Sequence, residues 1–295
     1  MKRNYLGLAI SLSLFTGLAH SQAQDQVPDA KQTKPSVSTL SNMDSITVSA
    51  RRRDETLLDV PIAVTAFTSE ALDTLNVQDL SDLDGQVPNL TIYAARGSNS
   101  TVTAYIRGVG QSDPLWGVDP GVGLYLNDVY IARPQGALPD VFDVERIEVL
   151  RGPQGTLYGK NTIGGAIKYV SKGLTTETKG SAQLTVGSYG QFDAKASIGG
   201  GNEMVRGRIA LASLNRDGFG RNLTLDEPVT NKDIFAIRGE LGFFFNDNFD
   251  AQIAFDSVSD DSKPRGAQML AVNPYAPGLL VSPKTQPLSS RYDVR

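Results

Sequence analysis

The chain has 295 residues, a formal net charge of −4, no cysteine and a single histidine, His20. This charge gives no reason to expect nucleic-acid binding, which depends on a basic surface. The lack of cysteine excludes disulfides, thiolate metal sites and cysteine nucleophiles. If the N-terminal segment is removed, no histidine remains, and histidine-dependent catalysis and zinc binding are excluded with it. We therefore expect no catalytic residue, no metal site and no cofactor, and the composition argues against an enzyme.

Residues 1–43 have the pattern of an export signal followed by a polar tether. A short basic start precedes a mostly apolar run over residues 5–19, which is too short to span a bilayer, and small residues flank Gln22. We interpret residues 1–23 as a cleaved secretory signal peptide, with an N-terminal membrane anchor as the alternative. Residues 24–43 are polar and aperiodic, which is typical of a disordered segment.

The next segment alternates polar and apolar side chains, with Ile46 and Val48 on one side. Taken alone, residues 44–50 predict a short strand. It is either the ordinary first strand of a domain or an edge that a partner sheet can pair with. The arginines at 51–53 that follow are typical of a solvated tether.

Residues 54–143 predict a mixture of short strands and short helices. The pattern indicates a strand at 60–67, a helix at 71–75 with a Thr or Ser N-cap, a helical turn at 79–83, strands at 90–93 and 101–107, and a hairpin at 122–131. We place the turn of this hairpin at Asn127-Asp128. The glycines at 121 and 123 resemble the start of a dinucleotide loop, but Leu126 stands where the third glycine belongs.

The stretch 144–172 organises the chain. It opens as a strand at 144–151, which Gly152-Pro153 breaks because proline has no N–H and glycine tolerates positive φ. Further glycines are expected to keep the following residues in turns until a returning strand at 166–170. A phosphate-binding loop is the alternative, since Gly159-Lys160 is similar to the end of that motif. However, the glycine spacing is wrong and Asn161 follows the lysine.

The residues after 172 alternate apolar and polar side chains in five runs, at 182–186, 192–198, 205–211, 235–245 and 249–255. The connections between the runs are tight except for a long polar one at 216–232. This pattern is typical of a membrane barrel with lipid outside and a wet lumen inside. A soluble antiparallel sheet alternates in the same way and is the alternative.

The chain resembles the plug domain of TonB-dependent outer-membrane receptors in three runs: Arg146-Ile147-Glu148-Val149-Leu150-Arg151-Gly152-Pro153-Gln154-Gly155, Leu157-Tyr158-Gly159 and Gly164-Gly165-Ala166-Ile167. Ile106-Arg107-Gly108 matches a further element of that family, and residues 44–50 resemble its TonB box. The resemblance implies a globular plug inside a barrel of about 22 strands. It also implies a box that lends its edge to TonB, the inner-membrane energy-transducing partner.

The resemblance also implies roles for individual residues. The box comprises Asp44, Ser45, Ile46, Thr47, Val48, Ser49 and Ala50. The plug signature and lock comprise Arg107, Gly108, Glu148, Arg151, Gly152, Pro153, Gly155, Gly159, Gly164 and Gly165. Within this set Arg107 and Arg151 are expected to pair with barrel carboxylates, with two locally paired surface cations as the alternative. Ligand-facing candidates in the long Gly/Pro-rich connections are Arg96, Trp116 and Arg133.

We therefore predict a mostly β chain, with a small α+β plug at 54–172 followed at 178–295 by about five antiparallel strands of an incomplete transmembrane β-barrel. About 22 strands of about 9–11 residues do not fit between 173 and 295, so we expect a fragment or truncated product. The expected function is energy-coupled uptake of a ferric siderophore or other small ligand across the outer membrane of a Gram-negative bacterium. The N-terminus is expected to be periplasmic and the barrel to face lipid. A secreted soluble periplasmic module built on the plug is the alternative.

Overall fold

The computed structural model describes residues 46–95, 100–112, 117–133, 142–222, 225–246, 248–265 and 292–294. The predicted signal peptide and polar segment lie outside these residues, together with Asp44, Ser45, Arg96 and Trp116. Within the described ranges, no helix is long and apolar enough to cross a membrane. The described elements up to residue 171 are called the N-terminal domain below. Five long strands that follow are called the long-stranded sheet.

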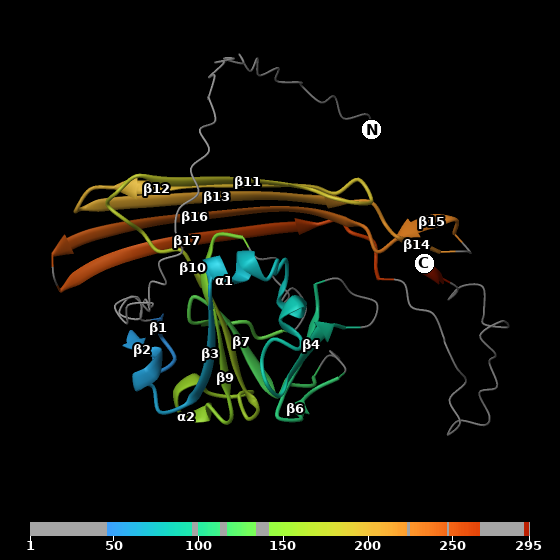
Figure 1. The fold of residues 1–295 in the computed structure, drawn as a ribbon. Helices are drawn as coiled ribbons and strands as arrows, with labels where there is room; N and C mark the ends of the chain where they lie inside the picture. The colour runs from blue at the N-terminus through green and yellow to red at the C-terminus, as the bar shows by residue number, and fades with distance from the viewer. Residues whose placement is uncertain are drawn as a thin grey trace, which may run out of the picture. The chain divides into compact units, whose positions relative to one another are not determined.

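The N-terminal domain is built on a mixed sheet in the order β3-β9-β10-β7-β8 (Figure 1). Its strands are β3 (Ala63–Thr68), β9 (Val144–Arg151), β10 (Gly165–Ser171), β7 (Val122–Leu126) and β8 (Val129–Tyr130). The pairing is antiparallel except between β7 and β10, which are parallel. Asn127 and Asp128 form the β7–β8 turn with φ of 45° and 65°, so the predicted hairpin and its turn are confirmed.

The smaller elements of the domain follow the sequence signals closely. A second sheet joins β4 (Leu90–Ala94), β5 (Val102–Ile106) and β6 (Val109–Gly110), while β1 (Thr47–Val48) pairs with β2 (Glu55–Thr56). The first α-helix, α1 (Ser69–Thr74), is capped by the Thr68 side chain, and the 3-10 turn η3 (Leu80–Leu83) begins with a capping box on Asp79. A further 3-10 turn, η2, covers Leu57–Asp59.

The prediction for the residues after Pro153 is wrong. The residues after Pro153 do not stay in turns, because Gly155–Tyr158 form the short helix α2. The Gln154 carbonyl accepts hydrogen bonds from the amides of Leu157 (3.2 Å) and Tyr158 (2.9 Å). Gly159 then ends the helix with φ of 82°. The glycine that we assigned to a turn therefore acts as a helix stop.

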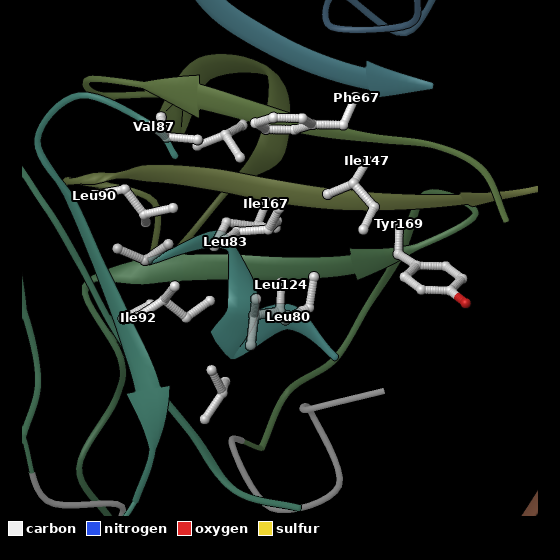
Figure 2. Close-up of a cluster of buried hydrophobic side chains, with 14 of the residues drawn as sticks. Phe67, Leu80, Leu83, Val87, Leu90, Ile92, Leu124, Ile147, Ile167 and Tyr169 are labelled. Atoms are coloured by element: carbon white, nitrogen blue, oxygen red, sulfur yellow. The ribbon is translucent and has the colours of Figure 1, made fainter. Parts of the chain in front are cut away.

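Both faces of the central strands are covered by apolar side chains. Ile147, Val149, Ile167 and Tyr169 face one cluster, which Figure 2 shows together with residues from η3, β4 and β7. Leu150 and Ala166 face a second cluster on the opposite side. A strand that is buried on both faces normally carries a continuous apolar run. The two buried charges on these strands, Glu148 and Lys168, are 0% and 1% exposed and therefore require an explanation.

The long-stranded sheet contains five antiparallel strands in sequence order (Figure 1). They are β11 (Lys179–Val186), β12 (Phe192–Gly201), β13 (Val205–Arg216), β16 (Lys232–Asn246) and β17 (Phe249–Asp260). The long connection between β13 and β16 carries two three-residue strands, β14 (Gly220–Asn222) and β15 (Glu227–Val229), and β14 also pairs with β18 (Tyr292–Val294). The five predicted strands are confirmed.

The two faces of the long-stranded sheet differ in the way that the alternation predicts. One face carries exposed large apolar side chains, among them Leu184, Ile209, Phe235, Ile253 and Phe255. The other face buries small residues and charged ones, such as Ala210, Ala212, Ala236, Arg208 and Arg238, against the N-terminal domain. An apolar outer face and a polar inner face are the arrangement of a lipid-facing barrel wall.

Candidate functional site: the N-terminal strand on its polar cluster

Strand β1 packs against the rest of the N-terminal domain. It pairs with β2 through Thr47↔Thr56 and Val48↔Glu55, and the Leu57 amide donates to the Ile46 carbonyl at 2.8 Å. Val48 and Ala50 are fully buried in the second apolar cluster of the domain. The predicted strand is therefore present, although the described pairing covers only two residues.

Three buried side chains bind the backbone that follows β1. Glu148 Oε1 accepts a hydrogen bond from the Ser49 amide at 2.8 Å. Lys168 Nζ donates to the Ser49 carbonyl at 2.9 Å and to Ser49 Oγ at 2.7 Å. The Tyr158 hydroxyl donates to the Ala50 carbonyl at 2.8 Å. We call Glu148, Tyr158 and Lys168 the Ser49 cluster.

The sheet register brings the two charged members of the Ser49 cluster together. Glu148 is directly opposite Lys168 in the β9–β10 pair, and both side chains lie on the face that receives β1. Each has a second partner of opposite charge. Arg146 Nε lies 2.7 Å from Glu148 Oε1, and Asp128 Oδ1 lies 2.9 Å from Lys168 Nζ. Two carboxylates and two cations therefore balance, which is what buried charges require.

Tyr158 is held in its protonated form. Burial raises the pKa of its phenol well above the ordinary value, and the carboxylates of Asp128 and Glu148 raise that pKa further. The hydroxyl thus remains a hydrogen-bond donor to the Ala50 carbonyl at any physiological pH. Lys168 also lies over the Tyr158 ring, with its Nζ 5.7 Å from the centroid.

The arginine run after β1 is not a tether. It forms the connection between β1 and β2, where Arg52 has φ of 58°. Arg51 Nε donates to Glu55 Oε2 at 2.7 Å, and an Arg53 nitrogen lies 2.7 Å from Glu55 Oε1. These hydrogen bonds and charges, with Arg51 contributing most, lower the pKa of Glu55 to about 2. The arginines therefore hold β1 and β2 together at their turn.

Arg107 reaches the C-terminal end of β9, where Arg151 is the last residue of the strand. Arg107 and Gly108 form the two-residue turn between β5 and β6, with φ of 53° and 78°. Gly152, directly after β9, has φ of 111°, which strains any residue with a Cβ, and a Cβ there would lie 3.2 Å from the Arg107 guanidinium. In the described part of the chain neither arginine forms an ion pair, and Arg151 Nε is buried without a hydrogen-bond partner. Their pairing with barrel carboxylates stays a prediction.

The double glycine at 164–165 is required by packing. A Cβ on Gly165, where φ is 152°, would lie 2.2 Å from the Leu150 carbonyl oxygen and 2.8 Å from the Ile106 side chain. A Cβ on Gly164 would lie 2.8 Å from the Val109 carbonyl oxygen. These two residues therefore let β10 start directly against β5, β6 and β9.

A contact that we did not predict links the domain to the long-stranded sheet. Asp143 has φ of 54°, and both of its carboxylate oxygens accept from Arg208 Nε at 2.9 Å. Beside it, Phe142 packs among Ala210, Ala212 and neighbouring residues of the sheet. Arg238 lies 5.1 Å from the Phe142 ring centroid. Nothing local in the sequence marks Asp143 for this role, because its partner is 65 residues further along the chain.

The ligand-facing residues stay predictions. Arg133 is exposed, whereas Arg96 and Trp116 lie outside the described residues. A cavity of about 790 Å³ lies between the domain and the sheet, with Tyr169, Arg216, Phe219 and Arg238 among its lining residues. Among the described residues, no group of three or more acidic or histidine side chains could hold a metal ion.

Comparison with known proteins agrees with this architecture. The model of the TonB-dependent receptor plug domain matches residues 56–166, from β2 to the start of β10. Residues 56–166 thus form a TonB-dependent receptor plug domain, and the antiparallel strands that follow it carry an outward apolar face. The chain as a whole is similar to TonB-dependent receptors.

Two curated relatives illustrate the range of the family. The vitamin B12 transporter BtuB of Vibrio vulnificus is 25% identical over 223 residues, which cover 74% of this chain and 33% of that protein. The iron-regulated outer membrane virulence protein of Vibrio cholerae is 28% identical over 191 residues, which cover 60% of this chain and 26% of that protein. The chain thus spans about a third or less of the length of these relatives.

Solved structures show the same fold. The ferric yersiniabactin uptake receptor FyuA of Yersinia pestis has a TM-score of 0.57 at 25% identity, covering 63% of this chain and 29% of the receptor. The pyoverdine receptor FpvA of Pseudomonas aeruginosa has a TM-score of 0.60 at 23% identity, covering 75% of this chain and 31% of the receptor. Both resemblances cover more of the chain than the N-terminal domain, which is called the plug from here on.

Proposed function

We propose that the chain serves energy-coupled uptake of a ferric siderophore or a similar iron complex across the outer membrane of a Gram-negative bacterium. In this proposal TonB is the partner and residues 44–50 are the segment that it binds. The N-terminus lies in the periplasm, and the apolar face of the long-stranded sheet contacts lipid.

The observation that carries the proposal is the placement of β1. It is a short extended segment whose only sheet partner among the described residues is β2. A strand with one free edge can be extended by a strand from a partner, which supplies main-chain hydrogen bonds. Coupling to an energised partner requires a segment of this kind at the start of the plug.

The iron complex is favoured by the solved structures, since the names of FyuA and FpvA refer to ferric yersiniabactin and pyoverdine. Vitamin B12 is the second candidate, because the curated relative BtuB is a vitamin B12 transporter that aligns with 74% of this chain. A soluble periplasmic module is disfavoured. Large side chains such as Phe235 (54% exposed) and Phe255 (61%) would then face water.

The test is a proline at Val48 in cells that express the whole gene from which this chain is read. Proline removes the Val48 amide and fixes φ, which prevents strand pairing at this position. Uptake of a radiolabelled ferric siderophore should fall to background while its binding to the cell surface persists. Thr39→Pro, in the polar segment before β1, is the matched control and should leave uptake unchanged. Uptake that survives Val48→Pro would refute the proposal, and labelled vitamin B12 in place of the siderophore separates the two ligands.

A further inference from the structure

The cavity between the plug and the long-stranded sheet has three arginines among its described lining residues. Arg238 pairs with Asp256, which faces it on β17. Arg265 pairs with Asp79 of the plug, with 3.6 Å between Nη2 and Oδ2. Arg216, the last residue of β13, forms no ion pair with any described residue. A ligand in the cavity can therefore still neutralise its charge.

The Arg216 guanidinium also has a donor left over. Its Nη2 donates to the Thr230 carbonyl at 2.9 Å, whereas its Nε is buried and has no hydrogen-bond partner in the described chain. A buried donor without an acceptor is unfavourable. In a guanidinium the Nε hydrogen and one Nη hydrogen point the same way, which is the fork that a carboxylate accepts. A carboxylate can thus bind this fork while Nη2 keeps its bond to Thr230.

An aromatic wall lies beside this fork. The guanidinium carbon of Arg216 lies 4.9 Å from the centroid of the Phe219 ring, and the centroid of the Tyr189 ring lies 5.9 Å from that of Phe219. Phe219 lines the same cavity. An aromatic group makes stacked or edge contacts with such a ring, and these contacts add to the effect of burial alone. The pair therefore favours a carboxylate that is attached to an aromatic ring.

The backbone that holds Arg216 and Phe219 is strained at two residues. Tyr189 has φ of 58°, and its carbonyl accepts from the Asp217 amide at 2.8 Å. Thr230, whose carbonyl binds Arg216, has φ of 65°. A positive φ is a genuine outlier for a bulky or β-branched residue, and such outliers cluster at functional sites. Both outliers here bind the segment 216–219, which favours a binding site over an ordinary connection.

We propose that Arg216 and Phe219 form a subsite for an aromatic carboxylate group of the transported ligand. Arg216 binds the carboxylate through Nε and Nη2, and Phe219 contacts the ring. This inference rests on the proposed function, because it takes the cavity as a place where the transported iron complex binds. It selects complexes whose chelator carries a benzoate-type group. The cavity of about 790 Å³ has the size of sites that hold drug-sized molecules, so it has room for more than this group.

The test uses the full chain in detergent and benzoate as the probe. Binding is measured by saturation-transfer NMR titration. Cyclohexanecarboxylate, which has the same charge but no aromatic ring, is the comparison ligand. Arg216→Gln removes the cation and keeps an amide that can donate to the Thr230 carbonyl. Arg206→Gln is the matched control, because Arg206 lies 4.1 Å from the Phe244 ring centroid in the same kind of contact and is not among the lining residues.

Benzoate affinity should fall about tenfold in Arg216→Gln, because hydrogen bonds between two charged groups are lost. It should not change in Arg206→Gln. Equal benzoate affinity in the two variants, or no benzoate binding to the unmodified chain, would overturn the inference. Benzoate binding needs no TonB, so its outcome is separate from that of the Val48→Pro uptake test. If binding depends on Arg216 but no ferric siderophore is taken up, the proposed function fails while the subsite stands.

A second variant covers the case in which Arg216→Gln lowers the melting temperature of the chain. Phe219→Leu leaves the Arg216 guanidinium in place and removes only the aromatic wall. The affinity for benzoate should fall and that for cyclohexanecarboxylate should not, so the preference for the aromatic acid should disappear. An unchanged preference in Phe219→Leu would overturn the inference independently of Arg216.

Discussion

The contact between Asp143 and Arg208 allows a specific prediction for the free energy of unfolding. The two side chains are 1% and 10% exposed, so each is almost fully removed from water. Asp143→Asn keeps the volume and tolerates the left-handed backbone, but it removes the carboxylate that binds Arg208 and leaves only Glu240, the cross-strand neighbour, near this guanidinium. Breaking a buried ion pair from one side costs about 3–5 kcal/mol. We expect the lower end, about 3 kcal/mol, because Ser197 Oγ still accepts from Arg208 at 2.9 Å.

The assay is guanidinium unfolding of the chain in detergent, followed by fluorescence of its single tryptophan. Arg208→Met and the double variant complete a cycle. The double variant should cost clearly less than the sum of the two single variants, because neither charge is left alone. Asp226→Asn is the matched control. Asp226 pairs with Arg221, and their side chains are 80% and 53% exposed, so the loss should stay below about 1 kcal/mol. Equal costs for Asp143→Asn and Asp226→Asn would refute the reasoning.

Two further predictions concern the plug. Gly165→Ala would place a Cβ 2.2 Å from the Leu150 carbonyl oxygen, so β10 must shift. We expect a loss above about 4 kcal/mol or no folded plug, against a near-neutral Gly155→Ala, where no atom lies within 4 Å. The contacts with Arg51 and Arg53 lower the pKa of Glu55 to about 2. The stability that the Glu55 carboxylate gives to the β1–β2 turn is therefore fully present above the ordinary pKa of 4.5. It is lost as the pH falls toward 2. The protection factors of the amides in residues 46–57 should therefore fall below pH 4.5 in the unmodified chain but not in Glu55→Gln, and pH-independent protection factors would contradict this account.

The sequence allows the strands and turns to be predicted where the signal is local. The alternation at 192–198 or 249–255 indicates a one-sided strand, and Asn127-Asp128 indicates a hairpin turn, because both signals rest on adjacent residues. The resemblance to the plug family identified Glu148 as a signature residue, but it did not indicate what the Glu148 side chain binds. That role depends on the register that sets Glu148 opposite Lys168 and brings Ser49, 99 residues earlier in the chain, to its carboxylate.

The misses have the same origin. The arginines at 51–53 have the composition of a tether, and only the pairing of β1 with β2 shows that they form a turn. Asp143 is one of many loop aspartates until Arg208 of the sheet lies against it. Non-local pairing of this kind leaves no periodic trace in the sequence. Helix α2 was missed for a different reason, since glycine both permits turns and stops helices.

Strand β10 sets the tolerance of this chain to changes in length. Lys168 lies under Ser49, while the next residue, Tyr169, donates from its hydroxyl to the Phe142 carbonyl at 2.8 Å beside the long-stranded sheet. One inserted or deleted residue between 165 and 168 would turn the ammonium toward the apolar cluster and the phenol toward β1, so both contacts would be lost together. The register irregularity between Val170 and Ser171 comes just after these contacts. Length variation should therefore be tolerated from residue 172 onward, in the connection to β11, and not within the strand.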